Sequence, residues 1–287
     1  MTDALVLDAV SKVYAPRGKH PIRAVDRLSL TIAKGEIVAL LGSSGCGKTS
    51  TLRMIAGFEE ATEGRIALNG REIHRLAPAK RHVAMAFEGY SLYPPLTVRE
   101  NIAFALKAQK LPRDAVDRRV REVAHLLQIE DVLDRHPGSI SGGQQQRASL
   151  GRALIREAEL QLLDEPMGQL EPQLRALLRG RIKHFVKERG LTAILVTHDQ
   201  TEANALADRI AVMEGGVLQQ FAAPGDLKDR PANLFTGTFI GEPPMNVFEA
   251  EAAEADGAIR LTLPGDVALS YPPEAFEPGA REAVLRR

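Results

Sequence analysis

The chain has 287 residues with 37 basic and 37 acidic side chains, so its formal net charge is zero. This balance argues against a protein that binds nucleic acid through an overall positive field. The single cysteine, Cys46, cannot form an intramolecular disulfide, the N-terminal segment lacks the layout of a secretion signal, and no apolar run approaches the roughly 20 residues of a membrane-spanning helix. We therefore expect a cytosolic protein of one large or two modest domains, with any membrane role depending on a partner protein.

The N-terminal part is predicted to be rich in β-strands. Apolar or alternating segments predict short strands at residues 5–13, 28–32, 36–41, 65–68 and 82–86. A turn is predicted from Tyr14 to Gly18. Tyr14 is there either an exposed aromatic that stacks on a flat base or a half-buried tyrosine at a sheet edge.

A glycine-rich segment, called here the phosphate loop, joins the apolar run 36–41 to the helix-forming residues 50–56. Its residues are Gly42, Ser43, Ser44, Gly45, Cys46, Gly47, Lys48 and Thr49. In the pattern G-x-x-x-x-G-K-[ST], glycines let backbone N–H groups converge on phosphate oxygens, and the following helix adds its positive N-terminal end. We expect Lys48 to reach the β- and γ-phosphates and Thr49 to give its hydroxyl to Mg²⁺. The strand–loop–helix setting predicts nucleotide binding.

Cys46 lies in this loop beside Lys48, at a helix N-terminus. Such a thiol is expected to react with alkylating reagents, with protection by ATP. The alternative is a loop residue that is merely tolerated.

Residues 97–129 have a different character from the strands before them. Two helical patterns, 97–110 and 113–129, predict a helical insertion in an otherwise α/β chain. Thr97 and Glu100 have the spacing of a capping box at the start of the first helix.

The next segment is Ser141-Gly142-Gly143-Gln144, called here the signature turn, which leads into a helix predicted at 144–156. A helix N-terminus that follows two glycines suits an anion. On its own the segment is equally a plain loop.

Chemically active side chains end two predicted strands. Asp164 and Glu165 follow the apolar strand 160–163, and His198 follows the strand 192–197. Adjacent carboxylates at the carboxyl end of a buried strand are costly unless they hold a cation or water, and ligands bind at this edge of parallel α/β sheets. The position favours a functional role for all three residues.

The C-terminal part alternates helices and strands and then changes composition after Gly241. Helices are predicted at 172–187, 201–207 and 224–240, and strands at 209–213, 217–221, 247–252 and 258–263. Two strands after residue 241 are marginally stable alone and leave open edges. We expect them to pack on the rest of the chain or on a partner, or the chain to continue beyond Arg287.

In this order and spacing, the phosphate loop, the signature turn, the Asp-Glu strand end and the strand-end histidine resemble the nucleotide-binding subunits of ATP-binding cassette importers, over about residues 4–240. P-loop proteins in general lack the signature turn. Flanking segments at 91–94, 97–102, 196–200 and 239–246 are similar to the carbohydrate-importer, or maltose-type, branch. The resemblance implies an α/β fold with a RecA-like P-loop core.

The same resemblance implies how the chain is divided. Residues 1–240 would form the nucleotide-binding domain, with an antiparallel β subdomain and a helical insertion at about 97–156. Residues 241–287 would form part of a β-rich, OB-like regulatory extension.

The resemblance also implies catalytic and metal-binding roles. Lys48, Glu165 and His198 would be the catalytic residues, with Glu165 orienting and deprotonating the attacking water and His198 contacting the γ-phosphate. Thr49 would hold Mg²⁺ with its hydroxyl, and Asp164 would hold it through water.

Further residues would complete the binding of ATP. Tyr14 would stack on the adenine, and Ser50 would belong to the phosphate site. Ser141, Gly143 and Gln144 would reach the ATP that a second copy of the protein holds. Because phosphoryl transfer needs mostly positioning and charge stabilisation, dividing the donors between two chains makes hydrolysis depend on their closing together.

Residue 88 and the segment 168–171 depart from the pattern of the family. Glu88 stands where glutamine is usual, and we expect it either to coordinate the metal equally well or to change the dependence of hydrolysis on Mg²⁺. Residues 168–171 replace the usual Ser-Ala-Leu-Asp turn by Gly-Gln-Leu-Glu, ending at Glu171, which puts the coupling between two copies in doubt.

The function implied is that of the ATPase subunit of an importer, a homodimer on the cytoplasmic face of the inner membrane. It would contact two permease subunits through about residues 88–101. An extracytoplasmic solute-binding protein would deliver a carbohydrate, polyol or sugar phosphate. The alternatives are another cargo (polyamine, metal or phosphonate), a regulatory cassette that binds ATP without hydrolysis, and a soluble cassette protein on ribosomes or DNA, which the single cassette and zero net charge disfavour.

Overall fold

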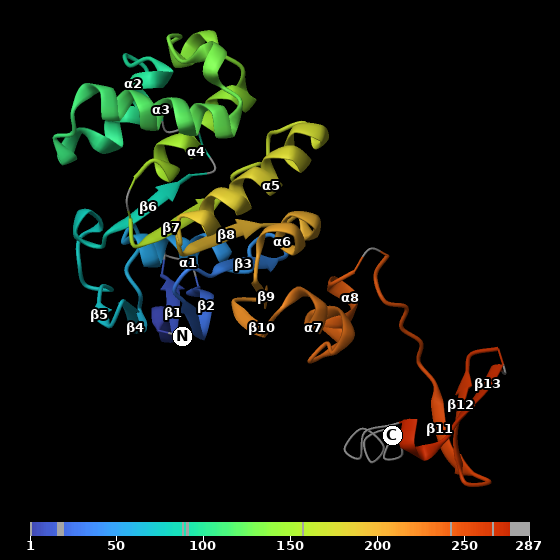
Figure 1. Ribbon diagram of the computed structural model, residues 1–287. Helices are drawn as coiled ribbons and strands as arrows, with labels where there is room; N and C mark the ends of the chain where they lie inside the picture. The colour runs from blue at the N-terminus through green and yellow to red at the C-terminus, as the bar shows by residue number, and fades with distance from the viewer. Residues whose placement is uncertain are drawn as a thin grey trace. The chain divides into compact units, whose positions relative to one another are not determined.

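The fold is that of a computed structural model, which describes residues 2–15, 20–87, 89, 92–156, 158–241, 243–265 and 267–275 (Figure 1). The chain divides into two compact units, Met1–Ile240 and Gly241–Arg287. Among the described residues we find no helix with the length and apolar character of a membrane span.

A six-stranded sheet forms the centre of the first unit, with the strand order β10-β9-β3-β8-β7-β6. Its strands are β3 (Ile37–Gly42), β6 (Val83–Ala86), β7 (Leu160–Asp164), β8 (Ala193–Thr197), β9 (Arg209–Glu214) and β10 (Val217–Ala222). Neighbouring strands are parallel except for β10, which pairs antiparallel with β9. Because β3, β8 and β7 are consecutive neighbours, the phosphate loop and the two polar strand ends lie at one edge of this sheet.

Both faces of the six-stranded sheet are covered, which explains why its strands are continuous apolar runs. Along β3, Ile37, Ala39 and Leu41 pack in one hydrophobic core, and Val38 and Leu40 pack in a second core on the opposite face. The first core includes residues from the helical part of the chain, which runs from Val98 to Leu154. The second contains α1 (Lys48–Ala56) and the antiparallel sheet.

The antiparallel sheet has the order β2-β1-β4-β5. Its strands are β1 (Asp3–Tyr14), β2 (Ile22–Ala33), β4 (Glu63–Leu68) and β5 (Arg71–Glu72). Strand β2 is longer than the predicted strand 28–32, because the pairing with β1 continues past irregularities near Ala9 and Arg27, both of which have positive φ. These bulges interrupt the alternation that sequence reasoning relies on.

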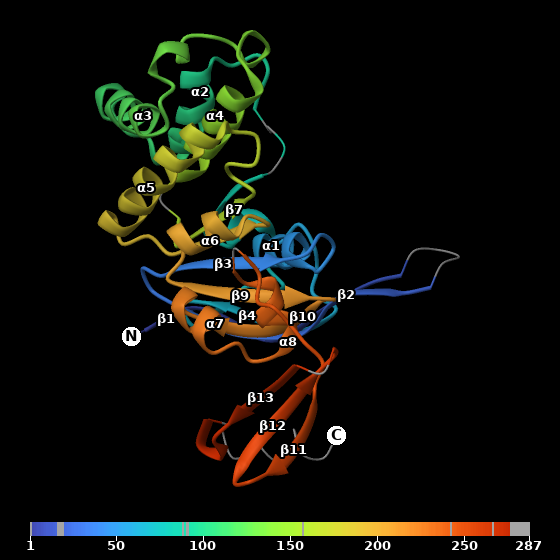
Figure 2. The ribbon, with the colours of Figure 1, turned by 90° about the vertical axis from the view of Figure 1, so that its right-hand side faces the viewer.

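The helical part lies at the opposite end of the first unit from the antiparallel sheet in both views (Figures 1 and 2). It contains α2 (Val98–Ala103), α3 (Arg113–Leu127) and α4 (Gly142–Leu154), with 3-10 turns at Phe104–Gln109, Glu130–Val132 and Pro137–Ser139. The capping box at Thr97 and Glu100 is present. The prediction of one helix over 97–110 was wrong beyond Ala103, because the α-helix ends there and a 3-10 helix follows.

The remaining helices of the first unit are α5 (Pro172–Glu188), α6 (Gln200–Leu206), α7 (Pro224–Asp229) and α8 (Leu234–Phe239). Helices α5 and α6 follow the strands β7 and β8, so each leaves the edge of the sheet where the polar strand ends lie. A Pro stands in the first turn of α5, where its missing N–H costs no hydrogen bond.

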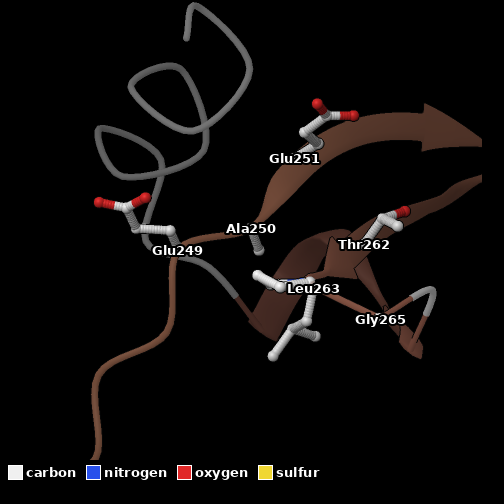
Figure 3. Close-up of a pocket in the computed structure, with 7 residues that line it drawn as sticks. Glu249, Ala250, Glu251, Thr262, Leu263 and Gly265 are labelled. Atoms are coloured by element: carbon white, nitrogen blue, oxygen red, sulfur yellow. The ribbon is translucent and has the colours of Figure 1, made fainter.

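The second unit contains a three-stranded antiparallel sheet of β11 (Glu251–Ala255), β12 (Ala258–Leu263) and β13 (Val267–Tyr271). The prediction of two strands was therefore wrong in number, since β13 pairs along the whole of β12, and the first strand begins later than residue 247. A hollow of about 470 Å³ in this unit is lined by residues 249–251 and 262–265 (Figure 3). It contains none of the residues that sequence analysis assigned to nucleotide binding.

Candidate functional site

The phosphate loop connects the buried end of β3 to α1 with backbone contacts that only glycine permits. A Cβ atom at Gly42 would lie 2.1 Å from the carbonyl oxygen of Met213, and one at Gly47 would lie 2.3 Å from that of Ala24. Gly47 also has φ +100°, in the region that favours glycine. Gly42 and Gly47 are thus fixed by close packing of the loop against β9 and the start of β2.

Lys48 is the first residue of α1 and its side chain folds back into the loop. Its Nζ donates hydrogen bonds to the carbonyl oxygens of Gly42, at 2.7 Å, and Ser43, at 2.8 Å, and the residue is 7% exposed. These bonds place the ammonium charge within the curve of the loop. There it can meet phosphate oxygens that the loop N–H groups bind.

A pocket of about 280 Å³ opens above the loop. Its lining combines loop residues, one residue of β2 and a strand-end carboxylate: Ala24, Ser44, Gly45, Gly47, Lys48, Thr49, Ser50 and Glu165. The tertiary structure therefore brings Glu165 to the phosphate loop across more than a third of the sequence.

Tyr14 ends β1 close to this pocket. Its hydroxyl lies 3.2 Å from Ser50 Oγ, and the Lys12 ammonium lies 4.8 Å from the centroid of its ring. The ring is half-buried. Its stacking on adenine stays a prediction.

Thr49, which lines the pocket, and Asp164 place two oxygens side by side. Thr49 Oγ1 donates to Asp164 Oδ1 over 3.4 Å, and Asp164 is 3% exposed. In the described part of the chain no three His, Cys, Asp or Glu residues gather as a metal site. One hydroxyl and one carboxylate fit Mg²⁺, which usually takes one or two protein oxygens and completes its shell with phosphates and water.

Glu165 directly faces His198. His198 Nδ1 lies 2.9 Å from Glu165 Oε1, and the two residues follow the neighbouring parallel strands β7 and β8. Glu165 has φ +45°, an uncommon backbone conformation for a residue with a side chain. The turn that this conformation creates directs the carboxylate to the pocket.

Arg175, which the sequence did not single out, contacts Asp199, the residue that follows His198. Arg175 of α5 donates to Asp199 Oδ2 at 3.0 Å and to the carbonyl oxygens of Gly168 and Leu170. Although burial opposes it, the backbone N–H of Glu202 and the Arg175 guanidinium hold the pKa of Asp199 below its ordinary value. The link ties the turn 168–171 to the segment that carries His198.

Among the acids of this region, Glu202 has the most strongly shifted pKa. Its Oε2 accepts from the Thr197 hydroxyl at 2.7 Å, and the residue is 2% exposed. Burial raises the pKa of Glu202 to about 7. The sequence around Glu202 in α6 contains no motif that would have identified this residue.

The signature turn lies outside the phosphate-loop pocket of its own chain. Ser141 caps α4, accepting from the Gln144 N–H at 3.3 Å, and the Ser141 N–H donates to Gln144 Oε1 at 2.9 Å. Neither these residues nor Gly143 line the pocket. The structure therefore brings together all the predicted strand-end residues and the phosphate loop but not the signature turn.

Two further predictions concern Glu88 and Cys46. Glu88 lies outside the described residues. Cys46 is 2% exposed, and its Sγ lies 3.6 Å from Lys48 Nζ. The thiol packs beneath the loop against Gly42, and this burial opposes the expected alkylation, which stays a prediction.

A phosphate loop beside a strand-end carboxylate on a parallel sheet defines a P-loop nucleotide-binding protein. The chain belongs to the ABC transporter family, whose model matches residues 25–168.

Three relatives from the same family are importer subunits by name. The trehalose import ATP-binding protein SugC of Mycobacterium tuberculosis is 46% identical over 93% of this chain and 66% of its own. The trehalose/maltose import ATP-binding protein MalK of Thermococcus litoralis is 46% identical over 89% of this chain and 69% of its own. The sn-glycerol-3-phosphate import ATP-binding protein UgpC of Paracoccus denitrificans is 44% identical, over 93% and 73%. The chain thus spans roughly two thirds of the length of these relatives.

A solved structure of an ATP-binding cassette is similar to this chain. The ATP-binding cassette MJ0796, in a dimeric post-hydrolysis state bound to ADP and Pi, superposes with a TM-score of 0.71 at 27% identity. The match covers 76% of this chain and 98% of that one. The fold class predicted from sequence, an α/β P-loop NTPase, is confirmed.

Proposed function

We propose that the chain is the ATP-hydrolysing subunit of an import complex. The observation that carries this proposal is the position of Glu165, whose carboxylate lines the same pocket as Lys48 and Thr49 and contacts His198. A base beside a phosphate loop is the element that hydrolysis needs in addition to nucleotide binding.

The residues of the pocket have separate tasks in the proposed reaction. The loop N–H groups and Lys48 bind the phosphates and stabilise the charge that develops on the transferred group. Glu165 orients the attacking water and accepts its proton, and His198 holds the Glu165 carboxylate and contacts the γ-phosphate. Thr49 and Asp164 would hold Mg²⁺, which would supply positive charge to stabilise the phosphates.

The active form is proposed to be a homodimer with two composite sites. The signature turn of one copy would complete the pocket of the other, since Ser141, Gly143 and Gln144 do not line the pocket of their own chain. The dimeric state of the cassette MJ0796, bound to ADP and Pi, supports this arrangement.

Two permease subunits are the proposed partners in the membrane, reached through about residues 88–101. A groove of about 610 Å³ lies between β6 and the helical part, and its lining includes Met85, Tyr93, Phe104 and Arg152. Tyr93 and Phe104 are exposed aromatics whose ring centroids lie 4.6 Å apart. Exposed aromatics in a groove suit a helix with an apolar face, here a cytoplasmic helix of a permease.

The proposed cargo is a carbohydrate, a polyol or a sugar phosphate, because the names of the relatives include trehalose, maltose and sn-glycerol-3-phosphate. An extracytoplasmic solute-binding protein would deliver it, and the subunit would work at the cytoplasmic face of the membrane. Residues 241–287 are proposed to be regulatory. Polyamine, metal and phosphonate remain the alternative cargoes.

Hydrolysis of ATP by the purified chain, with Mg²⁺ present, tests the proposal. The unmodified protein should release phosphate, whereas Glu165→Gln should bind a fluorescent ATP analogue with unchanged affinity and release none. Binding without hydrolysis by the unmodified protein would instead favour a regulatory cassette. The neighbouring genes, if they encode two permeases and a solute-binding protein, would identify the cargo.

A further inference from the structure

The side chain of Gln146 in α4 is buried and makes hydrogen bonds at both ends of its amide. The residue is 4% exposed. Its Nε2 donates to the carbonyl oxygen of Glu165 at 2.9 Å, and its Oε1 accepts from the backbone N–H of Gln169 at 3.1 Å. Because one partner only accepts and the other only donates, a single orientation of the amide satisfies both.

These bonds hold the backbone at the residue proposed to be the catalytic base. Glu165 has φ +45°, a conformation that an L residue keeps only when its surroundings impose it. Its N–H donates to the carbonyl oxygen of Val196 at 3.0 Å, and its own carbonyl oxygen accepts from Gly168 at 3.3 Å in addition to Gln146. The shortest of these bonds is the one from the Gln146 side chain.

We propose that Gln146 is a positioning residue for hydrolysis, which keeps Glu165 in the backbone conformation that points its carboxylate at the phosphate loop. The inference rests on the proposed function, because it assumes that Glu165 is the base. Gln146 does not line the nucleotide pocket, so its effect is on the chemical step and not on the binding of ATP.

Loss of the amide removes one hydrogen bond from each of two backbone groups. The Gln169 N–H loses its acceptor, and the Glu165 carbonyl keeps only the longer bond from Gly168. The turn then relaxes towards an ordinary backbone conformation and the carboxylate moves. A displacement of about 1 Å at a catalytic group lowers the rate roughly 100-fold.

The first test is the variant Gln146→Leu, which keeps the volume but loses both hydrogen bonds. We expect kcat for ATP hydrolysis to fall roughly 100-fold, with the affinity for a fluorescent ATP analogue unchanged. A variant with the kcat of the unmodified protein would overturn the inference, and so would a loss of kcat that parallels a loss of nucleotide affinity.

The second test is Gln146→Glu, whose ionised form can accept from Gln169 but cannot donate to Glu165. The protonated acid can do both, and burial favours protonation. The kcat of this variant, divided by that of the unmodified protein, should therefore rise as the pH falls. A ratio that stays low at every pH would overturn the inference.

Gln161→Glu is the matched control. Gln161 is also fully buried and donates to a backbone carbonyl, that of Arg156 at 3.1 Å, but it lies near the other end of β7. With kcat expressed per mole of folded protein, this variant should show no recovery of the ratio at low pH. The same recovery in both variants would mean that a buried carboxyl at either position has this effect, and would overturn the positioning role.

The outcomes separate the two proposals. Failure of the unmodified protein to hydrolyse ATP would contradict the proposed function. Normal hydrolysis by the unmodified protein and by Gln146→Leu, with none by Glu165→Gln, would contradict only the role of Gln146.

Discussion

His198 Nδ1 lies 2.9 Å from Glu165 Oε1 across the ends of two adjacent parallel strands. The relationship follows from the pairing of β7 with β8, which sets Asp164 opposite Val196 and brings the residues after each strand together. The histidine is thereby placed to hold the carboxylate at the phosphate-loop pocket. This pair would supply what hydrolysis needs beyond nucleotide binding, a base held in position.

Removal of this imidazole should therefore impair turnover and spare binding. We expect His198→Ala to lower kcat by about 100-fold, the usual scale for a group that assists proton transfer. His184→Ala, at an exposed position of α5, is the control because it removes the same ring from a site remote in function. A fall in ATP affinity of His198→Ala equal to its fall in rate would contradict this role.

The packing of the phosphate loop predicts that Gly47 tolerates no side chain. Gly47→Ala would place its Cβ 2.3 Å from the Ala24 carbonyl at φ +100°, and the strained conformation alone costs ~1–3 kcal/mol. We expect ATP binding to be lost and the free energy of unfolding to fall by at least this amount. Gly138→Ala, where a Cβ meets no atom within 4 Å, should leave both unchanged. Equal effects of the two substitutions would rule out this reading of the loop.

The proposed composite site predicts that Ser141 acts only in the dimer. We expect Ser141→Arg, made in the Glu165→Gln background, to bind ATP but to lose ATP-dependent dimerisation, measured by light scattering. The larger, charged side chain would occupy the place of the partner's phosphates. Gly180→Arg adds the same charge at an exposed position of α5 with open space around it and should still dimerise. Full dimerisation of Ser141→Arg would refute the assignment of the signature turn.

The raised pKa of Glu202 predicts how the free energy of unfolding changes with pH. Burial raises the pKa of Glu202 from an ordinary 4.5 to about 7, so the folded state holds a proton that the unfolded state releases. The carboxyl therefore contributes stability that is complete below pH 4.5 and lost as the pH rises through 7.

Glu202→Gln removes this titration while keeping an acceptor for Thr197. The free energy of unfolding of this variant, minus that of the unmodified protein, should increase by at most about 3 kcal/mol as the pH rises from 4.5 to 7. Chemical denaturation measures both values. Glu214→Gln, at the exposed end of β9, should follow the unmodified protein. A difference between Glu202→Gln and the unmodified protein that is constant with pH would show that Glu202 is not the titrating group.

Local features of the chain could be predicted because their physical causes are local. The phosphate loop is recognisable since Gly45 and Gly47 have positive φ, a local conformation that favours glycine. The strands β3, β7 and β8 are recognisable since burial on both faces demands apolar runs. The capping box at Thr97 needs only the spacing to Glu100. Strand β13 and the extension of β2 escaped prediction, because the pairing of strands across bulges and turns overrode a weak alternation.

By itself the sequence determined the class of protein, the position of the glycine-rich phosphate loop and the identity of the strand-end acid and histidine. Only the tertiary structure decided how these residues are held. The bonds from Gln146 to Glu165 and from Arg175 to Asp199 join segments 19 and 24 residues apart. No periodicity or motif encodes such contacts, because they arise from the packing of helices on a sheet and not from the chemistry of neighbouring residues.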